Sequence, residues 1–125
     1  MKIFKDFVDI VAKLRSPQGC PWDREQVPEN YKDYLREEVE ELIDAIEKND
    51  IDNIKEELGD VLLLVVMLSQ IYSEDDHFQI NDVLEGIRAK MIHRHPHVFG
   101  DVKVKDAEEV LENWKKIKAE EKAGF

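Results

Sequence analysis

The sequence has few residues that interrupt regular secondary structure and only one cysteine. Five glycines and four prolines in 125 residues are few for a β-rich or disordered chain. The single cysteine, Cys20, excludes an intrachain disulfide and is typical of a reducing cytoplasm. The first residues contain no long apolar segment, so no signal peptide is expected. The longest apolar run, 61–68, is far shorter than the roughly 20 residues of a membrane span. We therefore expect a cytoplasmic protein with no membrane partner.

Basic residues are also fewer than acidic ones. The chain has 29 acidic and 18 basic residues, which gives a formal net charge of −11. Such a surface repels polyanions, so nucleic acid is not expected as a partner. A small phosphate ligand stays compatible with this charge if metal ions accompany it. The length and the hydrophobic content of 42% predict a single domain over residues 1–125 with a modest core.

Apolar residues recur at helical spacing in five segments, and strand-like alternation is not evident. We predict helices over about 3–14, 30–48, 52–72, 81–94 and 107–122. The expected fold class is all-α, a bundle of four or five helices. The segment 61–68 is apolar on every side, which is typical of a helix buried all round. Because 125 residues are too few to surround it, we expect a partner subunit to cover part of this helix.

Four acidic side chains lie on or beside apolar helix faces instead of opposite them. On a helical wheel Glu38 falls between Tyr31 and Tyr34, and Glu41 lies three residues further on, beside the same stripe. Residues spaced i and i+3 are neighbours on a helix surface. Glu57 and Asp60 repeat this arrangement in the next helix. Burying carboxylates without a partner costs several kcal/mol or forces protonation, so a positive group is required nearby.

A divalent cation meets this requirement better than a lysine does, because Lys48 and Lys55 lie on other faces. Hard cations such as Mg²⁺ prefer carboxylate and water oxygens and often share a substrate's phosphates. Mn²⁺ is an acceptable substitute, whereas the absence of nearby histidine and cysteine disfavours zinc. The alternative is that the acids only favour a helix N-terminus. Two inward-facing pairs on consecutive helices favour the metal.

Two cations and two tryptophans are candidates for contact with an anionic nucleotide. Lys90 and Arg94 are spaced i and i+4, so they share a helix face and are suited to neutralising phosphate charge. A plain surface pair with packed aliphatic stems is the alternative. Trp114 is either a core residue or a platform on which a base stacks. Trp22 either closes a loop onto the helices or borders a nucleotide.

Other motifs are weaker. Glu74 and His77 form one E-x-x-H without a second copy, and a proline interrupts the helical spacing of His93 and His97. Neither pattern predicts a metal site well. The glycine-rich phosphate-binding motifs are absent, so phosphates are not expected to bind a glycine-rich loop.

Four segments occur in an order that resembles a known family. They are Gly19 to Gln26 (GCPWDREQ), Glu37 to Glu41 (EEVEE), Glu57 to Asp60 (ELGD) and Arg94 to Asp101 (RHPHVFGD). Together they resemble the MazG nucleoside triphosphate pyrophosphohydrolases of the all-α NTP pyrophosphatase superfamily, and the similarity covers nearly the whole chain. It implies Mg²⁺-dependent hydrolysis of an NTP or dNTP to the monophosphate and pyrophosphate.

The resemblance also implies roles for single residues. It assigns metal ligation to Glu38, Glu41, Glu57 and Asp60, the same four that the helical wheel selects. Glu37 matches the first acid of the motif and is implied to orient water or a second metal. Lys90 and Arg94 match triphosphate contacts. Trp114 matches a nucleotide contact, with Lys118 one turn further on. Family members are homodimers or dimer-of-dimers tetramers, which fits the apolar segment 61–68.

The chain departs from the family pattern in three respects. Many relatives contain two such domains, and Val27 and Asn30 stand where relatives often have Thr and Ser. Two alternatives stay open. One is a narrow pyrophosphatase for dUTP, dCTP or a damaged nucleotide. The other is a non-catalytic helical interaction module.

Overall fold

The computed structural model describes residues 2–124, which form helices and contain no strand. The helices are α1 (Lys2–Leu14), α2 (Pro21–Glu25), α3 (Pro28–Glu47), α4 (Ile51–Glu74), α5 (Ile80–Arg94), α6 (Pro96–Phe99) and α7 (Ala107–Lys122). The all-α class is therefore confirmed, and the five longer helices match the five predicted segments. The short helices α2 and α6 were not predicted, because four or five residues are too few to show a helical period.

The chain divides into two compact units, residues 1–80 and 81–125. The first unit contains α1 to α4, and the second contains nearly all of α5 together with α6 and α7. Each unit is described by itself below. The assignment of residues 1–125 to one domain stays a prediction.

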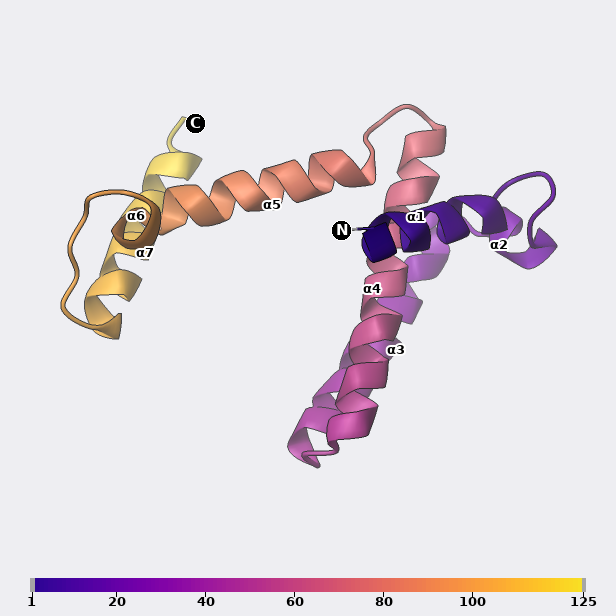
Figure 1. The fold of residues 1–125 in the computed structure, drawn as a ribbon, viewed down its shortest axis with the longest axis horizontal. Coiled ribbons are helices and arrows are strands. Elements are labelled where there is room, and N and C mark those ends of the chain that lie inside the picture. Colours follow the sequence, from indigo (N-terminus) through magenta and orange to yellow (C-terminus); the bar gives the residue numbers. More distant parts are fainter. Residues whose placement is uncertain (1, 125) are drawn as a thin grey trace. The chain divides into compact units, whose positions relative to one another are not determined.

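In the first unit α3 and α4 form an antiparallel hairpin, and α1 packs against α4 (Figure 1). The most buried apolar residues come from all these helices: Val11, Tyr31, Leu64, Val66, Met67 and Ile71. Partly buried residues of α1, including Phe4, Phe7 and Val8, pack around this cluster. The core therefore lies where α1, α3 and α4 meet, and it fixes α3 against α4.

A tight turn joins α3 to α4. Asn49 has a left-handed backbone with φ 51°, a conformation that asparagine tolerates better than most residues. The Asp50 N–H donates to the Ala45 carbonyl, and the Asn49 N–H donates to the Ile46 carbonyl. This is a Schellman motif, and it ends α3. Asp50 Oδ1 then accepts a hydrogen bond from the Asn53 N–H (3.3 Å), which caps the N-terminus of α4.

Helix α4 is not buried on every side within one chain. Leu64, Val66 and Met67 are buried, whereas Leu62 and Val65 are 43% and 39% exposed. The reason is geometric: α1 and α3 cover only part of the surface of α4. One chain therefore covers the segment 61–68 only in part, as its size led us to expect, and its coverage by a partner subunit stays a prediction.

In the second unit, α5 and α7 are joined by an ion pair, with Arg94 Nη2 3.1 Å from Glu121 Oε1. Trp114 on α7 packs edge-on against His95, with 5.1 Å between the ring centroids. No residue of α5, α6 or α7 within the described range is fully buried. Across residues 2–124, no helix is long and apolar enough to cross a membrane.

The core at the junction of α1 and α4 is expected to dominate the stability of the first unit. Ile71 is 5% exposed, so Ile71→Ala should lower the free energy of unfolding by about 2–5 kcal/mol through lost burial and a residual cavity. Ile3→Ala, at a residue that is 71% exposed, should change it by less than about 0.5 kcal/mol. Chemical denaturation measures both values. Equal effects of the two substitutions would contradict this placement of the core.

Candidate metal centre

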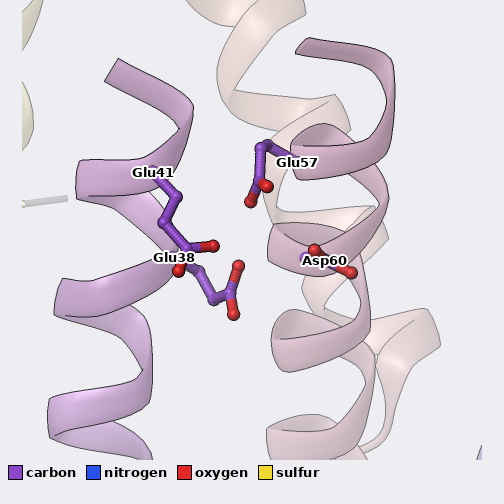
Figure 2. Close-up of side chains that lie close together, drawn as sticks. All are labelled: Glu38, Glu41, Glu57 and Asp60. Carbon is purple, nitrogen blue, oxygen red and sulfur yellow. The ribbon is translucent and has the colours of Figure 1, made fainter. Parts of the chain in front are cut away.

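The four acids selected from the sequence converge between α3 and α4. Figure 2 shows Glu38 and Glu41 extending from α3 toward the side of α4 that carries Glu57 and Asp60. One carboxylate oxygen from each residue lies within 4.8 Å of the corresponding oxygens of the other three. Four carboxylates at this separation can surround a single cation or a close pair of cations.

The turn at Asn49 sets the register of these acids. Glu41 and Glu57 each lie eight residues from Asn49 along the chain, and Glu38 and Asp60 each lie eleven residues from it. In an antiparallel hairpin, residues equally distant from the turn lie at similar heights. The cluster is therefore symmetric about the turn, with one pair of acids above the other.

Burial and mutual proximity disfavour the charged forms of these carboxylates. Glu57 is only 7% exposed, and its Oε2 atom is buried without a hydrogen-bond partner, as is Glu38 Oε2. Burial, together with the neighbouring carboxylates of Glu41, Glu38 and Asp60, raises the pKa of Glu57 to about 7. Burial also raises the pKa of Glu38, and the charge of Glu41 adds to this effect.

The donor set fits a hard divalent cation. None of the ion pairs formed within residues 2–124 includes any of the four acids, so no lysine or arginine neutralises the cluster there. The donors are all carboxylate oxygens, which Mg²⁺ and Mn²⁺ accept and which zinc sites seldom use alone. A cation would provide a partner for the two orphaned oxygen atoms and offset the repulsion among the four groups.

A cavity of about 180 Å³ adjoins this cluster in the first unit. Its lining comprises Trp22, Asp23, Tyr31, Tyr34, Glu38, Leu63, Leu64 and Met67. The Trp22 and Tyr34 rings are 6.3 Å apart between centroids, and Tyr34 meets Tyr31 edge-on at 5.5 Å. Glu38 belongs to both the acidic cluster and the cavity wall. The structure thus places Trp22 beside an aromatic cavity that reaches the candidate metal ligands.

The remaining predicted residues lie elsewhere. Glu37 is exposed on α3, and Lys90 and Lys118 are exposed on α5 and α7. Arg94 is not free, because its guanidinium binds the carboxylate of Glu121. Trp114 is partly buried, and its Nε1 atom has no acceptor. Lys90, Arg94, Trp114 and Lys118 belong to the second unit, so their roles as nucleotide contacts stay predictions.

Sequence reasoning missed the partner of Glu74. Instead of completing an E-x-x-H motif, its carboxylate binds Arg15, with Arg15 Nη2 2.6 Å from Glu74 Oε1. Arg15 and Glu74 are 59 residues apart, and no local spacing indicates such a contact. The nearby His77 packs against the Tyr72 ring.

The chain belongs to the MazG family. Residues 26–99 match the model of the MazG nucleotide pyrophosphohydrolase domain, and the resemblance noted in the sequence is thereby confirmed. That segment includes all four acids of the cluster.

Relatives and a solved structure agree with this assignment. The chain is 50% identical over 120 residues to the Thermotoga maritima nucleoside triphosphate pyrophosphohydrolase/pyrophosphatase MazG, covering 96% of this chain and 46% of that protein. It is 44% identical over 115 residues to the Escherichia coli (strain K12) nucleoside triphosphate pyrophosphohydrolase, covering 91% and 44%. A crystal structure of a mazG-related protein from Thermotoga maritima superposes with a TM-score of 0.76 at 29% identity, covering 92% of this chain and 98% of that one. The chain thus spans less than half the length of these two curated relatives.

The raised pKa of Glu57 predicts a pH-dependent stability of the metal-free protein. The folded protein holds a proton on Glu57 up to a pKa of about 7, whereas the ordinary value is 4.5. The contribution of Glu57 to the free energy of unfolding is therefore fully present below about pH 4.5 and is lost as the pH rises to about 7. Glu57→Gln, which stays neutral, should reduce this loss. Thermal unfolding in EDTA between pH 4.5 and pH 8 measures the effect.

The matched control is Glu56→Gln, at the exposed neighbouring position, which should keep the pH dependence of the wild type. Adding Mg²⁺ at pH 8 should raise the melting temperature of the wild type more than that of Glu57→Gln. If wild type and Glu57→Gln show the same pH dependence, the four acids do not repel one another as described.

Proposed function

We propose that this chain is a metal-dependent nucleoside triphosphate pyrophosphohydrolase that converts an NTP or dNTP to the monophosphate and pyrophosphate. The observation that carries the proposal is the convergence of four carboxylates, two of them with buried oxygens that lack partners, in a MazG-family chain. The names of relatives such as the Escherichia coli enzyme support the same reaction. Acids with a purely structural role have no reason to bury carboxylate oxygens that lack hydrogen-bond partners.

Glu38, Glu41, Glu57 and Asp60 are the proposed ligands of Mg²⁺, with Mn²⁺ as a substitute. When bound, the metal supplies positive charge for phosphate oxygens and activates water for attack. The four side chains hold their oxygens close together before the ion arrives, because the core fixes α3 against α4. Glu37, exposed one residue before Glu38, is proposed to orient a water molecule or to bind a second ion.

Lys90 and Arg94 are proposed to neutralise the charge that develops on the pyrophosphate leaving group. For Arg94, this role requires the guanidinium to share or leave the carboxylate of Glu121, which it binds through Nε and Nη2. Trp22, on the wall of the aromatic cavity, is proposed to pack against the base. Trp114 and Lys118 are proposed as further nucleotide contacts.

Removing one proposed ligand should abolish turnover without unfolding the chain. Glu38→Gln and Asp60→Asn keep the size of the side chain but remove its charge, so each should lower pyrophosphate release at least about 100-fold. The assay uses purified protein, Mg²⁺ and each common NTP and dNTP, with pyrophosphate and orthophosphate measured separately. The same panel distinguishes a broad enzyme from one restricted to dUTP, dCTP or a damaged nucleotide.

The matched control is Glu40→Gln, because Glu40 is exposed on the same helix and lies outside the cluster. It should keep wild-type activity. Turnover of the wild type in excess EDTA, or full activity in Glu38→Gln, would refute the metal centre. No turnover with any nucleotide would favour the non-catalytic interaction module.

A homodimer, or a tetramer built from two dimers, is the proposed assembly. Helix α3 exposes Val39, Ile43 and Ile46, and α4 exposes Leu58, Leu62 and Val65. Each set follows the spacing i, i+4, i+7, so each forms an apolar stripe on its helix. The six side chains are between 39% and 56% exposed in the single chain. Two adjacent helices with such stripes favour packing against a second copy of the same hairpin.

A charge on this surface should separate the subunits. Leu62→Glu would bury a carboxylate without a partner in the assembly, so sedimentation analysis should show a lower mass than for the wild type. Leu111→Glu places the same charge on an exposed leucine of α7 and should leave the mass unchanged. A wild-type protein that sediments as a monomer at micromolar concentration would contradict the proposed assembly.

A further inference from the structure

The wall of the aromatic cavity is formed in part by a helix that cannot be stable alone. Helix α2 has five residues and no buried side chain, and no side chain caps its N-terminus. Isolated helices of this length do not persist in water. Yet α2 carries Trp22 and Asp23 to the cavity, next to Tyr34 and the proposed ligand Glu38. Other parts of the chain must therefore hold α2 in place.

The loop before α2 is fixed by a close backbone approach. The Cys20 N–H donates to the Leu14 carbonyl (2.8 Å). Gly19 lies so close to the carbonyls of Lys13 and Leu14 that a Cβ atom at this position would clash with them. The end of α1 thus fixes the start of α2.

Arg15 holds the other end of α2. Its Nη1 atom donates to the carbonyls of Asp23 (2.6 Å) and Gln26 (2.8 Å), at the C-terminal end of α2. The Asp23 carbonyl also accepts from the backbone N–H of Gln26 (3.3 Å). The last carbonyls of a helix have few partners of their own, so a cation at this end is favourable. Arg15 Nε and Nη2 donate to the two carboxylate oxygens of Glu74 at 3.0 and 2.6 Å. Because Glu74 belongs to α4, this ion pair attaches the guanidinium to α4, and the Arg15 side chain is only 8% exposed.

Gln26 connects the same end of α2 to the cavity wall. It is 8% exposed, and its Nε2 atom donates to the Trp22 carbonyl (3.0 Å). Its Oε1 atom accepts from the Tyr34 hydroxyl (3.5 Å). Arg15, Gln26 and Glu74, here called the Arg15 network, thus join α1, α2, α3 and α4 behind the two aromatic rings.

We propose that Arg15 and Gln26 are positioning residues for nucleotide binding, which hold Trp22 and Asp23 in place on the cavity wall beside Glu38. This inference rests on the proposed function, since it takes the cavity as the place where the base packs. None of the three residues of the network belongs to the four acids or lines the cavity. Loss of the network should therefore weaken binding of the base without changing metal binding or the reaction step.

Arg15→Lys tests the proposal. Lysine keeps the charge facing Glu74, but one ammonium cannot bind two carbonyls and both carboxylate oxygens as the planar guanidinium does. We expect KM for a hydrolysed NTP and Kd for its α,β-methylene analogue to rise about tenfold, the effect of losing a hydrogen bond to a charged group. The value of kcat and the Mg²⁺ concentration for half-maximal activity should change by less than about twofold.

Inorganic tripolyphosphate, which has no base, provides the decisive comparison. Its Kd, measured by calorimetry with Mg²⁺, should be the same for Arg15→Lys and the wild type. Gln26→Glu, which removes the donor to the Trp22 carbonyl, should give the same pattern as Arg15→Lys. This second variant keeps the proposal testable if the first fails to fold, as judged by circular dichroism. Arg88→Lys is the control, because Arg88 forms an exposed ion pair with Glu85, and it should change none of these values.

The proposal and the proposed function fail in different ways. An unchanged Kd for the nucleotide analogue in both folded variants, or an equal weakening of analogue and tripolyphosphate, would overturn the positioning role. A wild-type protein that binds the analogue but releases no pyrophosphate from any nucleotide would instead overturn the proposed function.

Discussion

Mutual repulsion among four carboxylates is the constraint on which this structure depends. Glu57 is almost fully buried, and three other acidic oxygens lie within 4.8 Å of its own. The packing of α1, α3 and α4 must hold these groups together against their charge, since no lysine or arginine of the described residues pairs with them. Such a buried and mutually repelling cluster is stable when a cation binds it or when a carboxylate is protonated. The family relationship and the chemistry of the donors both favour the cation.

Much of the fold could be predicted because it follows from local spacing. The five longer helices show a clear period of apolar residues, and Asp50 marks the start of α4 by a capping preference that acts over three residues. The candidate ligands were found in the same way. Glu38 and Glu57 fall inside apolar stripes, and a helical wheel needs only the sequence to show this. What the wheel could not supply was the register of α3 against α4, which depends on the turn at Asn49.

The rest could not be predicted because it depends on contacts between distant residues. Arg15 and Glu74 are 59 positions apart, and Arg94 and Glu121 are 27 apart. No spacing rule connects either pair. These two arginines also show why charge alone is a poor guide to function: both are bound to a glutamate, one behind the cavity wall and one within the second unit. The sequence placed Arg94 correctly on its helix but did not reveal the competitor for its guanidinium.

The symmetry of the acids about Asn49 limits how the hairpin can vary in evolution. Surface turns usually accept insertions and deletions, and this one is exposed. One residue added between Glu41 and Glu57 within the helical frame would rotate the acids on one side by about 100° and move them away from their counterparts. The number of helical residues between each pair of acids and the turn is thus restricted by the geometry of the cluster.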